Sequence, residues 1–539
     1  MRRASVPIHR GARLAGVAAV VLVAVVVTQA VASAGRAPAA SPGVARTGAD
    51  SCKAVKKGGT LVYGVTQDVV SFDAANTQDN GSLWADMNVY QQLVRLTPDG
   101  SKLVGDLAQS WDVKKGGRVV VFHLRHNARF NDGSQVTAAD AKFSFDRTRS
   151  PKSVVNWTLE AVKSDRVVDK YTFEVTLKQP WAPFLNDISL WGASIMSQQA
   201  VKRLGAKIKT QPVSSGPFSV ADFKPGQYVL LKRNPYYWQK DSCGNRYPYL
   251  DAVRLQYLPN DSTRMAKLQA GAIDAAVDVP YNQINSLDSQ TNVSATTTPQ
   301  LGIVSIALSQ RNPNLRNAKV RQAMNYVIDR DAIVKAVFFG HATAATSPID
   351  PGVYFSSKKY GYQYNLAKAK QLMKEAGVTG FQTTLLTVSG DSISSGIGVI
   401  LQNELKQIGI DVKLQALDGT TEFGRMQKKQ FDMAYIYGTS DNLDPNANML
   451  FCCVSDGGAS ASYTDWKNPS ADALFRKTQT TVNFAQRAKL FDAWQKIVME
   501  DGPHLWLVNP TNRFAYRDNV HGFFIQNTAH WPLWVVWKS

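Results

Sequence analysis

The feature of this sequence that most limits its fold is an alternation of strand patterns with helix patterns through the body of the chain. Short runs of β-branched and aromatic residues predict strands, and these lie at 60–65, 119–124, 171–177, 228–232, 253–258, 305–308, 383–388, 412–414 and 433–436. Apolar residues spaced three and four positions apart predict helices between the strands, behind the caps Asp261 and Asn365 and over 320–327 and 484–499. This order predicts α/β lobes rather than a β-sandwich or a helical bundle.

The length of 539 residues predicts three or four domains, because a single domain usually holds about 100–200 residues. Apolar residues make up 44% of the chain and charged residues 19%, which is typical of a globular protein. The formal net charge is +19, but the basic residues occur at most in adjacent pairs such as Lys56-Lys57. A nucleic-acid-binding protein usually concentrates its basic residues, so no nucleic-acid partner is expected.

The amino terminus predicts export from the cell. Residues 1–13 hold four arginines and no acidic residue, residues 14–27 are only Leu, Val, Ala and Gly, and Ala32-Ser33-Ala34 follows. This order of a basic, an apolar and a cleavable part predicts a signal peptide over 1–34. A retained membrane anchor is the alternative, although a span needs about 20 apolar residues. Residues 35–57 begin with an Ala/Pro/Gly/Ser-rich stretch and are expected to form a flexible spacer.

An exported chain meets an oxidising environment, so its four cysteines can form disulfides. Cys452 and Cys453 are adjacent, and their Cα atoms, about 3.8 Å apart across a trans peptide, lie below the usual disulfide range. We therefore expect a bond between them to be strained. We favour a disulfide between Cys52 and Cys243, which would tie the start of the body to a Gly/Asn/Tyr/Pro-rich loop. The alternative is that all four cysteines are small buried residues.

Catalytic and metal-binding motifs are missing from the sequence. It holds no GxSxG, HExxH, P-loop or GxGxxG pattern, and no CxxC or paired Cys/His spacing. We expect no enzyme activity and no cofactor or metal, although an acid–base pair assembled by folding stays open. The aromatic residues between 514 and 537 predict a core region, with a ligand-stacking face as the alternative.

Several longer segments form a recognisable series. They are 107–112 (LAQSWD), 128–133 (ARFNDG), 231–238 (LKRNPYYW), 268–274 (LQAGAID), 316–329 (RNAKVRQAMNYVID) and 468–474 (NPSADAL). In this order they resemble the family 5 extracellular solute-binding proteins, which are the peptide/nickel-type receptors of ABC importers. The resemblance covers roughly residues 58–535.

The resemblance implies a two-lobed fold like that of periplasmic binding proteins, with an extra inserted domain and a hinge between the lobes. Domain I would combine 58–92, 210–300 and 505–535, domain II would be 93–209, and domain III would be 301–504. The implied function is that of an exported, monomeric substrate-binding component of an ABC transporter. It would capture oligopeptides by closure of its lobes, because the ligand contacts both lobes only in the closed form. It would then deliver them to a membrane permease.

The resemblance also implies a ligand contact for Asp441. In peptide-binding members of the family a carboxylate on the far lobe pairs with the amino group of the ligand, and the motif there resembles residues 440–445. Such a pair forms a charge-assisted hydrogen bond that is strong away from water. Asp444 in the same segment is expected to form a turn. Tyr435 and Tyr437 lie on the strand that enters this loop, and one of them is expected to wall the pocket.

Two further contacts are expected for the ends of an extended ligand. Leu301 and Gly302, where the chain should cross between lobes, could offer backbone groups to it, as in strand addition. Dipeptide-type receptors hold the ligand carboxylate with a basic residue in the far lobe, but no Lys or Arg occurs between Lys374 and Lys406. A carboxylate could instead meet Arg425 or a helix amino terminus near Ser394.

The cellular location and the solute stay partly open at this stage. The first cysteine, Cys52, follows Ala-Asp-Ser, which is a poor lipobox, so a position at the extracellular face of the membrane or free secretion is expected without a lipid anchor. The ligand could also be an oligosaccharide, a metal chelate or another small molecule in place of a peptide. A secreted hydrolase is the alternative from another class of protein.

Overall fold

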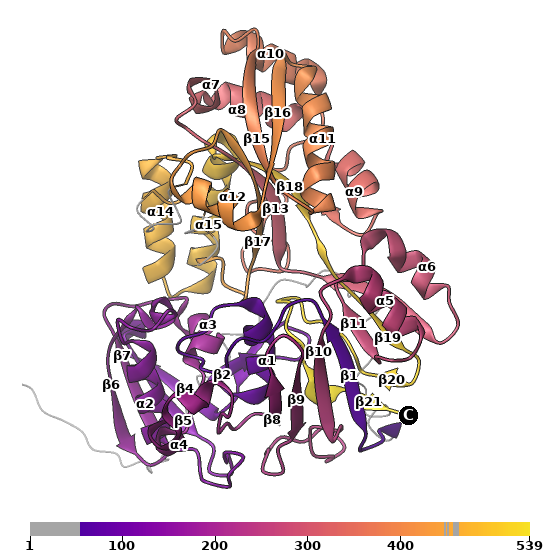
Figure 1. Ribbon diagram of the computed structural model, residues 1–539. Coiled ribbons are helices and arrows are strands. Elements are labelled where there is room, and N and C mark those ends of the chain that lie inside the picture. Colours follow the sequence, from indigo (N-terminus) through magenta and orange to yellow (C-terminus); the bar gives the residue numbers. More distant parts are fainter. Residues whose placement is uncertain (1–53, 447–448, 450–451, 456–462) are drawn as a thin grey trace, which may run out of the picture. The chain divides into compact units, whose positions relative to one another are not determined.

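The computed structural model describes residues 54–446, 449, 452–455 and 463–539. The expected signal peptide and nearly all of the expected spacer lie outside these residues. None of the helices in the described ranges is long and apolar enough to cross a membrane. The secondary structure is mixed, with sheets and helices alternating along the chain (Figure 1).

The largest sheet has seven strands in the order β12-β19-β11-β1-β10-β9-β8. Its strands are β1 (Thr60–Val65), β8 (Phe218–Lys224), β9 (Tyr228–Arg233), β10 (Ala252–Tyr257), β11 (Ala275–Val277), β12 (Val293–Pro299) and β19 (Thr511–Arg517). Strand β1 runs parallel to β10 and β11, and the remaining pairs are antiparallel. The helices of this part are α1 (Asn80–Val89), α5 (Asp261–Gln269) and α6 (Ile284–Asp288).

A second sheet has four antiparallel strands in the order β4-β5-β7-β6. The strands are β4 (Ala108–Lys114), β5 (Val119–Leu124), β6 (Val162–Asp169) and β7 (Thr172–Leu177). The small pair β2 (Val94–Leu96) and β3 (Leu103–Gly105) precedes it, and its helices are α2 (Ala138–Thr148), α3 (Phe184–Asp187) and α4 (Gln198–Leu204). Phe122, Phe145 and Phe173 fill the core between this sheet and α2.

The third sheet has six strands in the order β14-β18-β13-β17-β15-β16. The strands are β13 (Gly302–Leu308), β14 (Thr343–Ala344), β15 (Phe381–Val388), β16 (Ile410–Leu417), β17 (Met433–Thr439) and β18 (His504–Asn509). The helices are α7 (Pro313–Arg316), α8 (Ala318–Val327), α9 (Arg330–Phe338), α10 (Leu366–Glu375), α11 (Ser392–Lys406), α12 (Gly419–Gln427), α14 (Pro469–Thr480) and α15 (Phe484–Asp501). Helix α11 packs on β15 and β16 (Figure 1).

The chain passes between the seven-stranded and six-stranded sheets at two short links. Strand β12 ends at Pro299 and β13 begins at Gly302, while Pro510 alone separates β18 from β19. Asp350 braces the links: its carboxylate accepts the Gly302 N–H at 2.9 Å and the Asn509 side-chain amide at 3.1 Å. Short links of this kind are where two lobes can rotate against each other. The predicted division into three domains stays a prediction, and β18 crosses its boundary between 504 and 505.

Sequence patterning located nine of the described strands and one of the two predicted helix caps, Asn365. It missed other strands, such as β4, β6 and β12, and it was wrong in two local details. Helix α5 is capped by Asn260 instead of Asp261, because Asn260 Oδ1 accepts the Thr263 N–H at 2.9 Å. The aromatic carboxy-terminal region is mainly core, as predicted, with Phe514 and Trp531 each 2% exposed.

The second failure concerns the cysteines. The sulfur atoms of Cys452 and Cys453 are bonded to each other, so the alternative that all four cysteines are unpaired buried residues is wrong. The distance criterion describes bridges between separate segments, whereas two adjacent side chains can close a small ring across one peptide. Cys243 is also disulfide-bonded. Its predicted partner Cys52 lies outside the described residues, so that pairing stays a prediction.

Candidate solute-binding cavity

The loop that follows β17 carries Asp441 and is held by hydrogen bonds on both sides of it. The Ser440 N–H donates to the Leu301 carbonyl at 2.7 Å, and the Asp444 N–H donates to Asn442 Oδ1 at 2.9 Å. The Asn442 side-chain amide also reaches the Asn186 carbonyl at 3.3 Å. Because its neighbours are anchored, the Asp441 side chain projects from a fixed piece of backbone.

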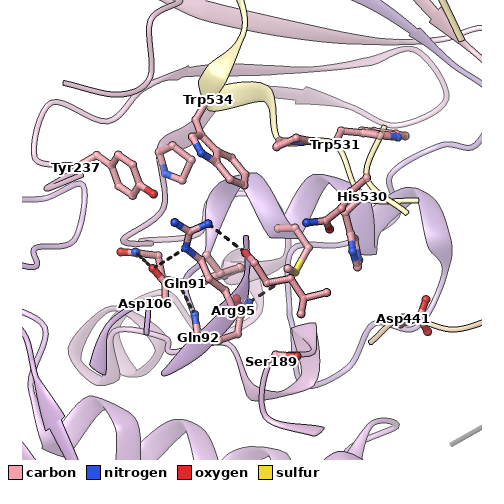
Figure 2. A pocket seen from close by; sticks show the side chains of 16 residues that line it. Gln91, Gln92, Arg95, Asp106, Ser189, Tyr237, Asp441, His530, Trp531 and Trp534 are labelled. Carbon is pink, nitrogen blue, oxygen red and sulfur yellow. Dashed lines mark hydrogen bonds and ion pairs between the residues drawn. The ribbon is translucent and has the colours of Figure 1, made fainter. Parts of the chain in front are cut away.

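Asp441 lines three cavities. The main cavity, of about 550 Å³, is bounded by β17, α12 and residues such as Tyr463 and Trp506. The crossover cavity, of about 270 Å³, includes Gln300 and Pro510 from the two links between sheets. The third, of about 30 Å³, is the small cavity of Figure 2. A residue common to all three can contact a ligand that extends from one cavity into another.

At the end away from Asp441, the small cavity is lined by an arginine and an aspartate that neutralise each other. Arg95 lies 3.5 Å from Asp106, and its guanidinium is 5.6 Å from the centre of the Trp534 ring. The side chain of Gln91 and the backbone of Gln92 also donate to Asp106. Figure 2 shows this network well apart from Asp441, with no interaction drawn to Asp441. These charges therefore stabilise the wall and leave Asp441 uncompensated.

The Asp441 carboxylate makes no hydrogen bond or ion pair with any residue in the described part of the chain. Burial raises the pKa of Asp441 to about 7. Asp441 is only partly exposed, and a carboxylate partly removed from water without a partner is unfavourable, a penalty that a nearby cation relieves. The side chain is thus prepared to accept an ammonium group.

The walls of the main cavity are aromatic and nearly free of positive charge. Tyr435 and Tyr437 of β17 both line it, and their contact with a ligand stays a prediction. Trp157, Phe423, Tyr463 and Trp506 add to the aromatic lining. Burial lowers the pKa of His504 to about 3, so this lining histidine is neutral. Among the described lining residues the charged side chains are the carboxylates of Glu422, Asp441 and Asp444.

The crossover cavity contains a basic residue that the sequence did not single out. Arg513, on β19, lies 3.4 Å from Asp278, and its guanidinium stands 4.3 Å from the centre of the Tyr281 ring. A basic ligand contact was expected in the far lobe, whereas Arg513 belongs to the other sheet. No local pattern marks it, because its partner Asp278 is 235 residues away.

Leu301, Gly302 and Arg425 do not line the two larger cavities, whereas the amino terminus of α11, predicted near Ser394, borders the crossover cavity through Asp391 and Ile393. The Leu301 N–H donates to the Asn527 carbonyl, and the Leu301 carbonyl accepts from Ser440. The Gly302 N–H is taken by Asp350, and its carbonyl by Asn509. These backbone groups are therefore used inside the protein. Arg425, near the end of α12, donates to Gln415 at 3.1 Å and lines none of the three cavities.

The arrangement is that of a binding site. Within the described residues, no group of three or more His, Cys, Asp or Glu side chains is placed to hold a metal ion. Aromatic walls, an uncompensated carboxylate and a position beside two links between sheets suit enclosure of a solute. These features define the class of two-lobed solute-binding proteins.

Comparison with known proteins identifies the family. The family model described as bacterial extracellular solute-binding proteins, family 5 Middle, matches residues 102–460. The chain belongs to this family, which confirms the resemblance seen in its sequence. It is the substrate-binding component of an ABC importer.

Curated relatives and solved structures agree with this assignment. The glutathione-binding protein GsiB of Escherichia coli (strain K12) is 28% identical over 475 residues, covering 86% of this chain and 92% of the relative. The probable D,D-dipeptide-binding periplasmic protein DdpA of the same strain is 29% identical over 477 residues, with 86% and 91% covered. Both relatives are named as binding proteins, and the name of DdpA places that protein in the periplasm.

The solved structure of the periplasmic binding protein DppA from Helicobacter pylori, in complex with the peptide STSA, is 27% identical to the chain. The similarity covers 90% of this chain and 98% of that one, with a TM-score of 0.76. The oligopeptide-binding protein AppA from Bacillus subtilis, in complex with a nonapeptide, is 25% identical, with 90% and 100% covered and a TM-score of 0.75. The expected α/β fold of two-lobed periplasmic binding proteins is thereby confirmed.

Proposed function

We propose that this protein captures oligopeptides that have a free amino terminus and delivers them to its membrane permease. The observation that carries the proposal is the uncompensated carboxylate of Asp441 in an aromatic cavity. The ligand ammonium would pair with Asp441, while the aromatic walls would pack against side chains. The peptides bound by the DppA and AppA structures support the same class of ligand.

The charges of the described residues that line the cavities favour peptides longer than two residues, because they offer no free positive group to the ligand carboxylate. Arg513 is the basic residue of the crossover cavity, and it is already paired with Asp278. The main cavity has no Lys or Arg among its described lining residues. A compact dipeptide would place its carboxylate near Asp441 without a full positive charge to meet it. A longer chain carries its carboxylate away from these acidic walls.

Two measurements test this function. Native mass spectrometry of protein purified from its own host should show co-purifying peptides. Isothermal titration calorimetry should then show strong binding of such a peptide and at least 100-fold weaker binding of its N-acetylated form. A co-purifying sugar or metal complex, or equal affinity for both peptide forms, would refute the proposal.

The state of the mature protein is part of the proposal. We infer cleavage before Gly35, a monomer without a lipid anchor or nucleic-acid partner, and a position at the extracellular face or free secretion. Amino-terminal sequencing of the mature protein decides the first point, since Gly35 indicates cleavage and Met1 a retained anchor. Light scattering of the same sample measures the oligomeric state.

A further inference from the structure

Besides Asp441, the main cavity is lined by a second carboxylate without an ion pair among the described residues, that of Glu422. Glu422 lies in the first turn of α12 and is 7% exposed. Its Oε1 atom is buried and has no hydrogen-bond partner among the described residues. Buried polar atoms are almost always paired, so an unpaired one beside a cavity has a free capacity for a ligand.

The electrostatic surroundings of Glu422 favour a positive ligand group. Burial, and after it the nearby charge of Asp391, raises the pKa of Glu422 to about 7. Asp391 caps α11 by accepting the Ile393 N–H at 2.9 Å, and it lines the adjoining crossover cavity. A cation near Glu422 would be attracted by both carboxylates, and an anion would be repelled by both.

The side chains that line the cavity with Glu422 suit the methylene chain of a long basic side chain. Phe423 and Met426, from the same helix as Glu422, line the cavity. Tyr435 and Tyr463, from other segments, also line it. The rings of Phe423 and Tyr463 lie edge to face with their centres 6.0 Å apart. Lysine and arginine side chains bury their methylene groups against apolar surface and direct the charged end to a polar group. Aromatic faces add cation–π attraction.

We propose that Glu422 is the specificity-determining residue of a subsite for a basic side chain, lysine or arginine, of the bound peptide. The inference rests on the proposed function, since it supposes that the ligand is a peptide. Asp441 meets the amino terminus, and Glu422 selects a side chain in the same cavity. The protein would therefore prefer cationic peptides although its own formal net charge is +19.

Affinity selection tests the subsite. Purified protein is incubated with a pool of random peptides of three to six residues, and the bound fraction is identified by mass spectrometry. We expect peptides containing Lys or Arg to be enriched at least tenfold over the pool. The Glu422→Gln variant should bind a similar total amount of peptide, with this enrichment reduced to less than twofold.

Glu404 provides the matched control. It is also a buried glutamate, 9% exposed, whose pKa burial raises to about 7, but it lies on α11 and lines none of the three cavities. Glu404→Gln should keep the full enrichment. If Glu422→Gln fails to fold, Glu422→Asp serves instead, because it keeps the charge and should retain a reduced preference.

The outcomes separate the two proposals. Peptide binding without Lys or Arg enrichment, or enrichment that survives in Glu422→Gln, refutes the subsite and leaves the peptide function in place. A wild-type protein that retains no peptide from the pool refutes both.

Discussion

Asp441 and Asp444 lie three residues apart in one loop, line the same cavity and differ in their partners. Asp444 is 3% exposed and accepts two hydrogen bonds from Arg487 of α15, one of them 2.9 Å long. Asp441 has no partner among the described residues, and burial raises its pKa to about 7. The Arg487 guanidinium, which comes from a distant helix, thus gives the Asp444 carboxylate a structural role. The Asp441 carboxylate stays available for a ligand.

The expected role of Asp444 as a turn former captured part of this difference. Asp444 Oδ1 accepts the Asn446 N–H at 3.0 Å, which is a turn bond of the predicted kind. The ion pair with Arg487 was not foreseen, because 43 residues separate the partners. Residue type and loop position alone therefore do not distinguish a structural aspartate from a ligand-binding one.

The largest expected effect is on stability at Asp444. Asp444→Ala leaves the buried Arg487 guanidinium without its partner, and breaking such a pair costs about 3–5 kcal/mol of unfolding free energy. Urea denaturation measures the loss. Asp441→Ala is the matched control and should lower the unfolding free energy by less than about 1 kcal/mol. Equal losses of unfolding free energy in the two variants would show that Asp444 is no more structural than Asp441.

The second effect is on binding at Asp441. Asp441→Asn should weaken binding of a free-amine peptide about 100-fold in calorimetry, because the charge-assisted bond becomes a neutral one. At pH 8 the ligand-free variant should be as stable as the parent or more stable, since it no longer holds a partly buried charge that has no partner among the described residues. Unchanged affinity would show that Asp441 does not contact the amino group.

The third effect is the pH dependence of that affinity. Asp441 must be ionised to pair with an ammonium group, and burial raises its pKa to about 7. Affinity for a peptide without Lys or Arg should therefore rise by up to about tenfold per pH unit from 5.5 to 7 and then level off. Calorimetry across this range measures the slope. Asp441→Asn should abolish it, and a slope that persists in the variant would assign the titration to another group.

The smallest effect is expected at Arg425. This side chain bonds to Gln415 and lines none of the three cavities. Arg425→Ala should change peptide affinity by less than twofold in the same calorimetric assay. A loss of tenfold or more would mean that Arg425 reaches the ligand carboxylate after lobe closure, as the sequence argument allowed.

The fold class, nine of the described strands and several helix starts could be predicted because their causes are local. The β-branched run of β5 and the Asn365 cap of α10 act within one or two turns of chain. The loop after β17 and its tyrosines were singled out differently, through the resemblance of residues 440–445 to a motif of the family. Asp441 belongs to this group as far as its position is concerned.

The tertiary structure decided which of these groups stay unpaired. From the sequence, Glu422 is an ordinary acidic residue, and Arg513 is one of many scattered basic residues. Because Glu422 is buried beside a cavity and its Oε1 atom has no hydrogen-bond partner among the described residues, it is a candidate for binding a ligand side chain. Pairing with Asp278 neutralises the charge of Arg513. Such properties depend on which distant side chains contact one another and on how much water is excluded from them. A local pattern of residues determines neither.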